Sequence, residues 1–153
     1  LQTRNQVITK AQEYTVFAVP KRDLKHIGSG IGIGKGVVNG LVAFSRKDID
    51  ALKEKGLPLI LVRPDTVPDD MELLFDCQGL LTSRGGVTSH AAVTATRLGL
   101  VGVVNCRQLK VLEAQGFCRI GEHTLSAGDP IAIDAGSGMI CLGHYPIETL
   151  RTF

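Results

Sequence analysis

His90 is the residue whose surroundings best fit covalent chemistry. It follows two glycines, Thr88 and Ser89 in the stretch RGGVTSHAAV, and an alanine-rich run comes after it. Residues 89–98 have the pattern of a helix that ends at Gly99. The first N–H groups of a helix lack partners within it, and with the helix dipole they favour a bound anion. Because Thr88 or Ser89 can cap this helix, the sequence predicts an anion site with an imidazole in its first turn.

The spacing along this helix turns His90 away from the apolar face. That face comprises Ala91, Ala92, Ala95 and Leu98, whereas His90, Thr94 and Arg97 share a different one. The positive end of the helix dipole disfavours imidazolium, so we expect a neutral ring with a nucleophilic nitrogen. A phosphoryl group on that nitrogen would bring negative charge to a position that favours it.

Other interpretations of His90 compete with phosphoryl transfer. The simplest is a histidine that caps or packs locally, which is what we expect of His26, His123 and His144. A hydrolase pair of Ser89 with His90 is disfavoured, because neighbouring helical residues point about 100° apart. No G-x-S-x-G motif is present either.

The glycine-rich stretch of residues 28–36 is not a nucleotide loop. A phosphate loop needs Ser or Thr after its Gly-Lys, and here Gly36 follows Lys35. A G-x-G-x-x-G motif fails because Ile33 occupies the third glycine position. Alternation of glycine with Ile and Ser favours a bent edge strand.

The amino-acid composition of the chain disfavours several classes of protein. The 153 residues include 17 basic and 15 acidic ones, with no long basic run and no Trp, so we expect no nucleic-acid partner. No apolar run approaches the roughly 18 residues of a membrane span, and LQTRNQ does not resemble a signal peptide. The four cysteines form no CxxC pair, which disfavours a metal site, and we expect reduced packing thiols in the cytoplasm.

The hydrophobic pattern alternates between strands and helices. After the glycine-rich strand, helices are predicted at residues 46–56, 68–79 and 89–98. Buried strands are predicted at residues 57–64 and 100–104, and a short strand at residues 79–81. Three late strands are predicted at residues 117–120, 129–135 and 138–143, and residues 146–153 have a helix-like pattern. This order predicts an α/β domain with a mixed sheet.

The sequence resembles a known family at the residues that carry this chemistry. The stretch GLLTSRGGVTSHAAVTATRLG is similar to the signature of the phosphohistidine (swivelling, or mobile) domain of PEP-utilising enzymes. That family includes pyruvate phosphate dikinase and phosphoenolpyruvate synthase. GIGIGKGVVNG, LILVRPDTVPDDM and LSAGDPIAIDAGSGMICLG resemble its other segments, so the resemblance covers residues 28–143.

The resemblance implies a β/β/α swivelling fold at residues 28–144, between an arm or linker at 1–27 and a tail or linker at 145–153. It implies that His90 is the phosphocarrier of a phosphotransferase that is incomplete as this domain alone. The residues that would shape its phosphate pocket are Thr82, Arg84, Gly85, Gly86, Thr88 and Ser89. Thr88 matches a threonine that plant dikinases phosphorylate for regulation.

The same resemblance implies that the partners are an ATP-binding domain and a PEP/pyruvate-binding domain with magnesium. The domain itself would bind no cofactor or metal. Thr96 stands where the family usually has Arg, and Arg97 follows it. This departure leaves open which partner domains His90 serves and what the final acceptor is. The alternative is a non-catalytic binding module that keeps the fold.

Overall fold

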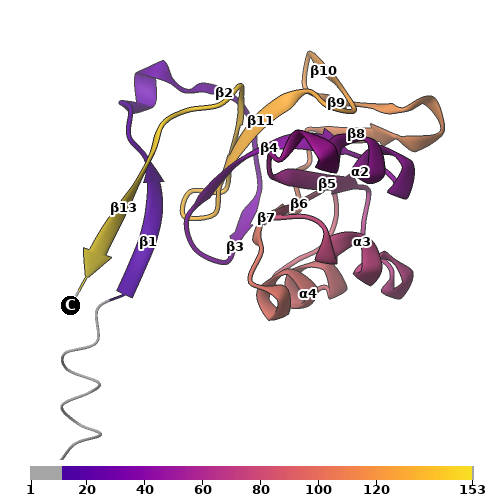
Figure 1. Ribbon diagram of the computed structural model, residues 1–153, viewed down its shortest axis with the longest axis horizontal. Helices are drawn as coiled ribbons and strands as arrows, with labels where there is room; N and C mark the ends of the chain where they lie inside the picture. Colours follow the sequence, from indigo (N-terminus) through magenta and orange to yellow (C-terminus); the bar gives the residue numbers. More distant parts are fainter. Residues whose placement is uncertain (1–11, 153) are drawn as a thin grey trace, which may run out of the picture.

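An eight-stranded mixed sheet forms the middle layer of the computed structural model, which describes residues 12–152 (Figure 1). Its strand order is β2-β12-β11-β4-β5-β6-β7-β3, and only the neighbours from β4 to β7 run parallel. Its strands are β2 (Lys25–Ser29), β3 (Ile31–Ile33), β4 (Val37–Ala43), β5 (Leu59–Arg63), β6 (Gly79–Thr82), β7 (Val101–Val104), β11 (Pro130–Asp134) and β12 (Met139–Leu142). The predicted mixed α/β sheet is confirmed.

The α-helices of residues 12–152 cover one face of this sheet. They are α2 (Arg46–Leu52), α3 (Met71–Phe75) and α4 (His90–Leu98), with short 3-10 turns at Lys21–Asp23, Lys53–Lys55, Pro68–Asp70 and Glu113–Gln115. Ile49 of α2, Leu74 of α3 and Ala95 of α4 share one buried cluster with Leu59 and Leu61 of β5. Because side chains alternate along a strand, the other residues of β5 point to the opposite face.

A second, three-stranded sheet covers that opposite face. It contains β8 (Leu109–Leu112), β9 (Phe117–Ile120) and β10 (His123–Ser126). Ile120 and Leu125 pack there against Ile60 and Val62 of β5. The layers are therefore β/β/α, as the resemblance implied. The hydrophobic pattern of the sequence predicts β9 but not β8 or β10.

A two-stranded ribbon projects from one side of these layers (Figure 1). It pairs β1 (Gln12–Phe17) with β13 (Ile147–Thr152), so Gln12 lies opposite Thr152. The helix-like pattern inferred for the tail was therefore wrong. Thr15 Oγ1 accepts a 2.9 Å hydrogen bond from Val37 N, which ties the ribbon to β4.

The glycine-rich stretch forms two edge strands instead of one. β2 and β3 lie at opposite ends of the strand order, and the chain bends between them at Gly30. A Cβ on Gly32 would lie 1.7 Å from the carbonyl oxygen of Ala135, so only glycine fits this crossing. The predicted bend at the sheet edge is confirmed.

Two predicted boundaries shift in the structure. α3 ends at Phe75 and Gly79 begins β6, so the helix predicted to extend to Gly79 was too long. The sheet begins at Lys25, inside the predicted arm, and residues 1–11 and 153 lie outside the described part of the chain. The division at residues 27/28 and 144/145 stays a prediction. Within residues 12–152, no helix has the length and apolar character that a membrane crossing requires.

Candidate functional site

The start of α4 is fixed by Ser89. Its Oγ accepts a hydrogen bond from Ala92 N at 3.2 Å and donates one to Gly86 O at 2.7 Å. Of the two predicted candidates, Thr88 and Ser89, it is Ser89 that forms the N-cap. Gly99 ends the helix as predicted, in a left-handed conformation. The Ser89 hydroxyl is therefore used by the helix end and the loop, which agrees with rejecting a hydrolase pair.

The two glycines before this helix have different environments. Gly85 has φ +105°, and a Cβ there would lie 2.8 Å from Ser89 Oγ, so the cap requires glycine at this position. A Cβ on Gly86 would have no neighbour within 4 Å. Gly85 therefore shapes the loop, whereas Gly86 borders open space beside the helix start.

The His90 side chain is exposed and has two hydroxyl neighbours of unequal closeness. Its Nδ1 lies 3.0 Å from Thr66 Oγ1, and its Nε2 lies 3.5 Å from Thr94 Oγ1. Both threonines are buried, at 5% and 3% exposure. Hydrogen bonds weaken strongly with distance, so Nδ1 is held firmly and Nε2 only weakly. Nε2 is therefore the less engaged of the two ring nitrogens.

Thr66 is the site residue that the sequence analysis did not assign. β5 and β6 are parallel neighbours, with Arg63 in register with Thr82, so the loops after them leave the same edge of the sheet. The Thr-x-Pro-x-Asp resemblance was visible, but only topology brings Thr66 to His90. We call residues 63–70 and 82–90 the site loops.

The other predicted pocket residues divide into exposed and supporting ones. Arg84 and Thr88 are exposed on the loop. Thr82 is fully buried, and its hydroxyl donates to Arg84 O at 2.7 Å, so it supports the loop from below. Thr94, predicted on a face away from the core, is buried. That part of the helix-face prediction was wrong, although His90 and Arg97 are exposed as expected.

The four cysteines are free and buried, in contrast to the exposed His90. Burial raises the pKa of the Cys77 and Cys118 thiols to about 12 and that of Cys141 to about 11. Burial also raises the pKa of Cys106. These thiols stay protonated at neutral pH and act as packing groups. Residues 12–152 contain no cluster of three or more His, Cys, Asp or Glu side chains that could hold a metal ion.

A β/β/α domain with an exposed histidine at a capped helix start defines a class that comparisons with known proteins identify. Residues 57–138 match the family described as PEP-utilising enzyme, mobile domain. The pyruvate, phosphate dikinase of Clostridium symbiosum is 41% identical over 123 residues, which is 80% of this chain and 14% of that protein. The chain therefore belongs to the family of PEP-utilising enzyme mobile domains.

Two further relatives give the same result. Chloroplastic pyruvate, phosphate dikinase 1 of Zea mays is 36% identical over 122 residues, covering 80% of this chain and 13% of that protein. Pyruvate, phosphate dikinase of Rhizobium meliloti is 38% identical over 134 residues, covering 87% of this chain and 15% of that protein. The chain spans about one seventh of the length of these relatives.

Proposed function

We propose that His90 accepts a phosphoryl group from one partner domain and passes it to another, in an enzyme like pyruvate, phosphate dikinase. The observation that carries this proposal is the asymmetry of the contacts of its ring: Nδ1 lies 3.0 Å from Thr66 Oγ1, whereas Nε2 lies 3.5 Å from Thr94 Oγ1. A hydroxyl that accepts Nδ1–H leaves the lone pair on Nε2.

The transfer step follows from that arrangement. The Nε2 lone pair attacks phosphorus, an N–P bond forms, and the P–O bond to the donor breaks with its electron pair on the leaving oxygen. The proton on Nδ1 remains against Thr66 Oγ1. The phosphorylated ring therefore stays a good leaving group, and the same step in reverse delivers the phosphoryl group to an acceptor.

The helix start supplies the charge stabilisation for the phosphorylated state. Side chains of a helix lean toward its N-terminus, so a group on the His90 ring lies near the first turn of α4. The N–H groups of His90 and Ala91 have no acceptor within the helix and, with the dipole, favour a dianion. Gly86 leaves the approach to this end open.

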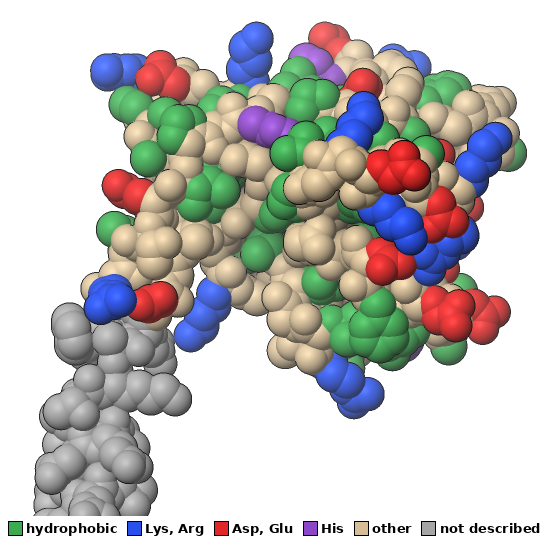
Figure 2. All heavy atoms as spheres, in the orientation of Figure 1, with side chains coloured by type: hydrophobic (Ala, Val, Ile, Leu, Met, Phe, Trp, Pro, Cys, Tyr) green, Lys and Arg blue, Asp and Glu red, His purple; other side chains and the backbone are tan. Residues whose placement is uncertain are grey.

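Exposed apolar side chains around His90 support contact with a partner. Val67 is 50% exposed, Phe75 67%, Val87 66% and Val93 46%, and all belong to the site loops, the end of α3 or the first turns of α4. Figure 2 shows hydrophobic side chains gathered at the surface over α3 and α4. Such a concentration of apolar surface favours a face that other protein surfaces cover.

The partners we propose are an ATP-binding domain and a PEP/pyruvate-binding domain, on the same or another chain. ATP and magnesium belong to those partners, and the mobile domain binds neither. The relatives are named for pyruvate and phosphate, and each contains several times more sequence than this chain, enough for both domains. The unpaired thiols suit a reducing compartment, so we place the protein in the cytoplasm.

A labelling experiment tests the proposed function. The chain is incubated with the ATP-binding domain of a dikinase and Mg-ATP, or with its PEP-binding domain and PEP, and its mass is measured. We expect a gain of one phosphoryl group that acid removes and base preserves, and no gain in His90→Asn. Folded protein that stays unlabelled with both partners contradicts the proposal and favours a non-catalytic binding module.

A further inference from the structure

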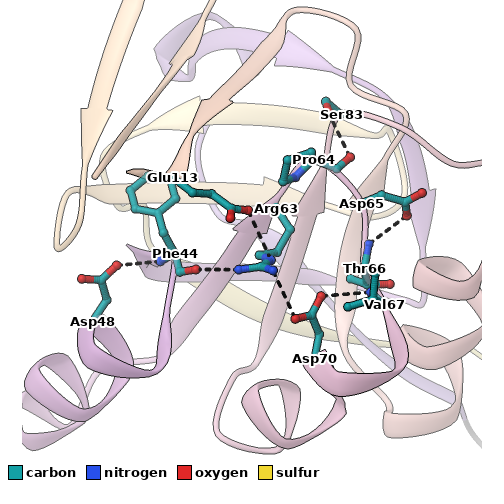
Figure 3. Close-up of polar contacts among 10 residues, drawn as sticks. All are labelled: Phe44, Asp48, Arg63, Pro64, Asp65, Thr66, Val67, Asp70, Ser83 and Glu113. Carbon is teal, nitrogen blue, oxygen red and sulfur yellow. Dashed lines mark hydrogen bonds and ion pairs between the residues drawn. The ribbon is translucent and has the colours of Figure 1, made fainter. Parts of the chain in front are cut away.

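An ion pair lies directly behind the loop that carries Thr66 (Figure 3). Arg63 Nη2 lies 3.3 Å from Asp70 Oδ1, and the two side chains are 20% and 5% exposed. A carboxylate this deeply buried is unfavourable unless its oxygens are paired. The hydrogen-bond partner of the second carboxylate oxygen therefore indicates which part of the loop this ion pair positions.

That second oxygen holds the backbone next to Thr66. Asp70 Oδ2 accepts a 3.0 Å hydrogen bond from Val67 N, and Asp70 N donates a 2.9 Å bond to Val67 O. Thr66 N donates to Asp65 Oδ1 at 2.8 Å, so consecutive amides of the loop are fixed by side-chain carboxylates. The backbone on both sides of the Thr66 side chain is thereby restrained.

Arg63 connects this restraint to the rest of the fold (Figure 3). Its Nη1 donates to Phe44 O at 3.1 Å, and its Nε lies 3.4 Å from Glu113 Oε1 without hydrogen-bond geometry. The guanidinium is thus positioned by segments that follow β4 and β8. Pro64 O also accepts bonds from Ser83 Oγ and Arg84 N, both at 3.0 Å, which join the two site loops.

We propose that Arg63 and Asp70 are positioning residues for the phosphocarrier. They hold Val67 N, and through it they place Thr66 Oγ1 where it accepts the proton of His90 Nδ1. This fixes one tautomer of the imidazole and keeps the lone pair on Nε2. The inference rests on the proposed function for its purpose, but the tautomer itself is a property of the unphosphorylated chain.

The arrangement of the two site loops supports this role over a purely structural one. Thr66 is buried, and the contact of its hydroxyl is with the His90 ring. That hydroxyl projects from a loop of irregular backbone between β5 and the turn at Pro68–Asp70. Without the bond from Val67 N to Asp70 Oδ2, the loop would keep its anchor at Pro64 and the turn bond from Asp70 N to Val67 O, but it would lose the bond that holds the amide next to Thr66. The His90 ring would then be free to adopt either tautomer.

The test compares imidazole ¹⁵N chemical shifts of the uniformly labelled 153-residue chain at alkaline pH, without any phosphoryl donor. We expect the Nδ1–H tautomer to dominate in the unmodified chain and in Thr66→Ser, and both tautomers to be populated in Thr66→Val and Asp70→Ala, which has no side-chain acceptor for Val67 N. Asp76→Ala is the matched control, because it removes an aspartate paired at 2.7 Å with Arg46 on the exposed surface. It should leave the His90 shifts unchanged.

Phosphoryl transfer supplies the second readout. Asp70→Ala should slow labelling of His90 by roughly tenfold, since small misplacements of reacting groups have effects of this order or larger. Arg63→Lys, which keeps the charge but loses the planar guanidinium, should slow it less and serves if Asp70→Ala does not fold. Unchanged tautomer populations in folded Asp70→Ala, or in Arg63→Lys where Asp70→Ala does not fold, would overturn the inference. Failure of the unmodified chain to be labelled would instead count against the proposed function alone.

Discussion

The site loops contain an imidazole, whereas the buried cluster around Cys106 and Cys118 contains thiols. We call this buried cluster the sulfur core. Thiolates are intrinsically the stronger nucleophiles, yet burial raises the pKa of Cys118 to about 12 and keeps its sulfur protonated and inaccessible. His90 is exposed, with hydroxyl groups at both ring nitrogens. The comparison teaches that access and polar neighbours decide which side chain this fold can use in chemistry.

The largest effect is expected from truncating a side chain in the sulfur core. Such a change should lower the free energy of unfolding without slowing the labelling of His90. Ile120 is fully buried there, and Ile120→Ala should lower the free energy of unfolding by about 2–5 kcal/mol. Ile120→Val, as a graded control, should lower it by about 0.5–1.5 kcal/mol. Urea unfolding measures both. If the labelling rate per folded molecule fell along with stability, the two regions would not be independent.

Gly85 and Gly86 allow stability and labelling rate to be compared within one of the site loops. Gly85→Ala should lower stability by about 1–3 kcal/mol, because it forces a left-handed backbone on alanine and crowds the helix cap. Gly86→Ala should change stability by no more than about 0.5 kcal/mol and slow labelling by about tenfold, because its methyl group enters the open approach to the helix start. Thermal unfolding and labelling rates distinguish them. Unimpaired labelling of Gly86→Ala would show that the donor does not approach from this side.

At neutral pH the smallest effect is expected from the thiols themselves, because their contribution to stability changes only in alkaline solution. Folding raises the pKa of Cys77 and Cys118 from about 9 to about 12, so the unfolded chain loses these protons first. The contribution is complete below pH 9 and is lost as pH rises from there toward 12. Stability measured against pH should decline over that window, and less steeply in Cys118→Ala. Iodoacetamide at neutral pH should leave the folded chain unmodified and alkylate it after denaturation.

The start of the helix at His90 was predictable because its signals are local. Ser89 as cap, Gly99 as stop and the alanines between them lie within one stretch of sequence, and the structure confirms both ends. Thr66 could not be assigned in the same way, since it lies 24 residues from His90 and reaches it only through the pairing of β5 with β6. Non-local contacts of this kind leave no periodic pattern.

The errors at the ends of the chain have the same cause. Residues 147–152 form a strand because β1 lies beside them, far away in sequence, and a short segment without its partner gives an ambiguous hydrophobic pattern. Thr94 was placed by helical spacing on an open face. The core buries it nonetheless, because a contact surface can extend beyond the apolar stripe of the helix. Propensity and spacing describe one element, whereas burial depends on its neighbours.

The ribbon of β1 and β13 brings the incoming and outgoing strands to a single place, with Gln12 opposite Thr152. Because its two ends are adjacent, this domain can be inserted into a surface loop of another protein without moving apart the residues on either side of the insertion. The same geometry makes the unit portable for engineering, because a host needs to offer only two adjacent backbone ends. The transplanted domain would keep His90 together with the site loops that contact it, because all of these residues lie between β1 and β13.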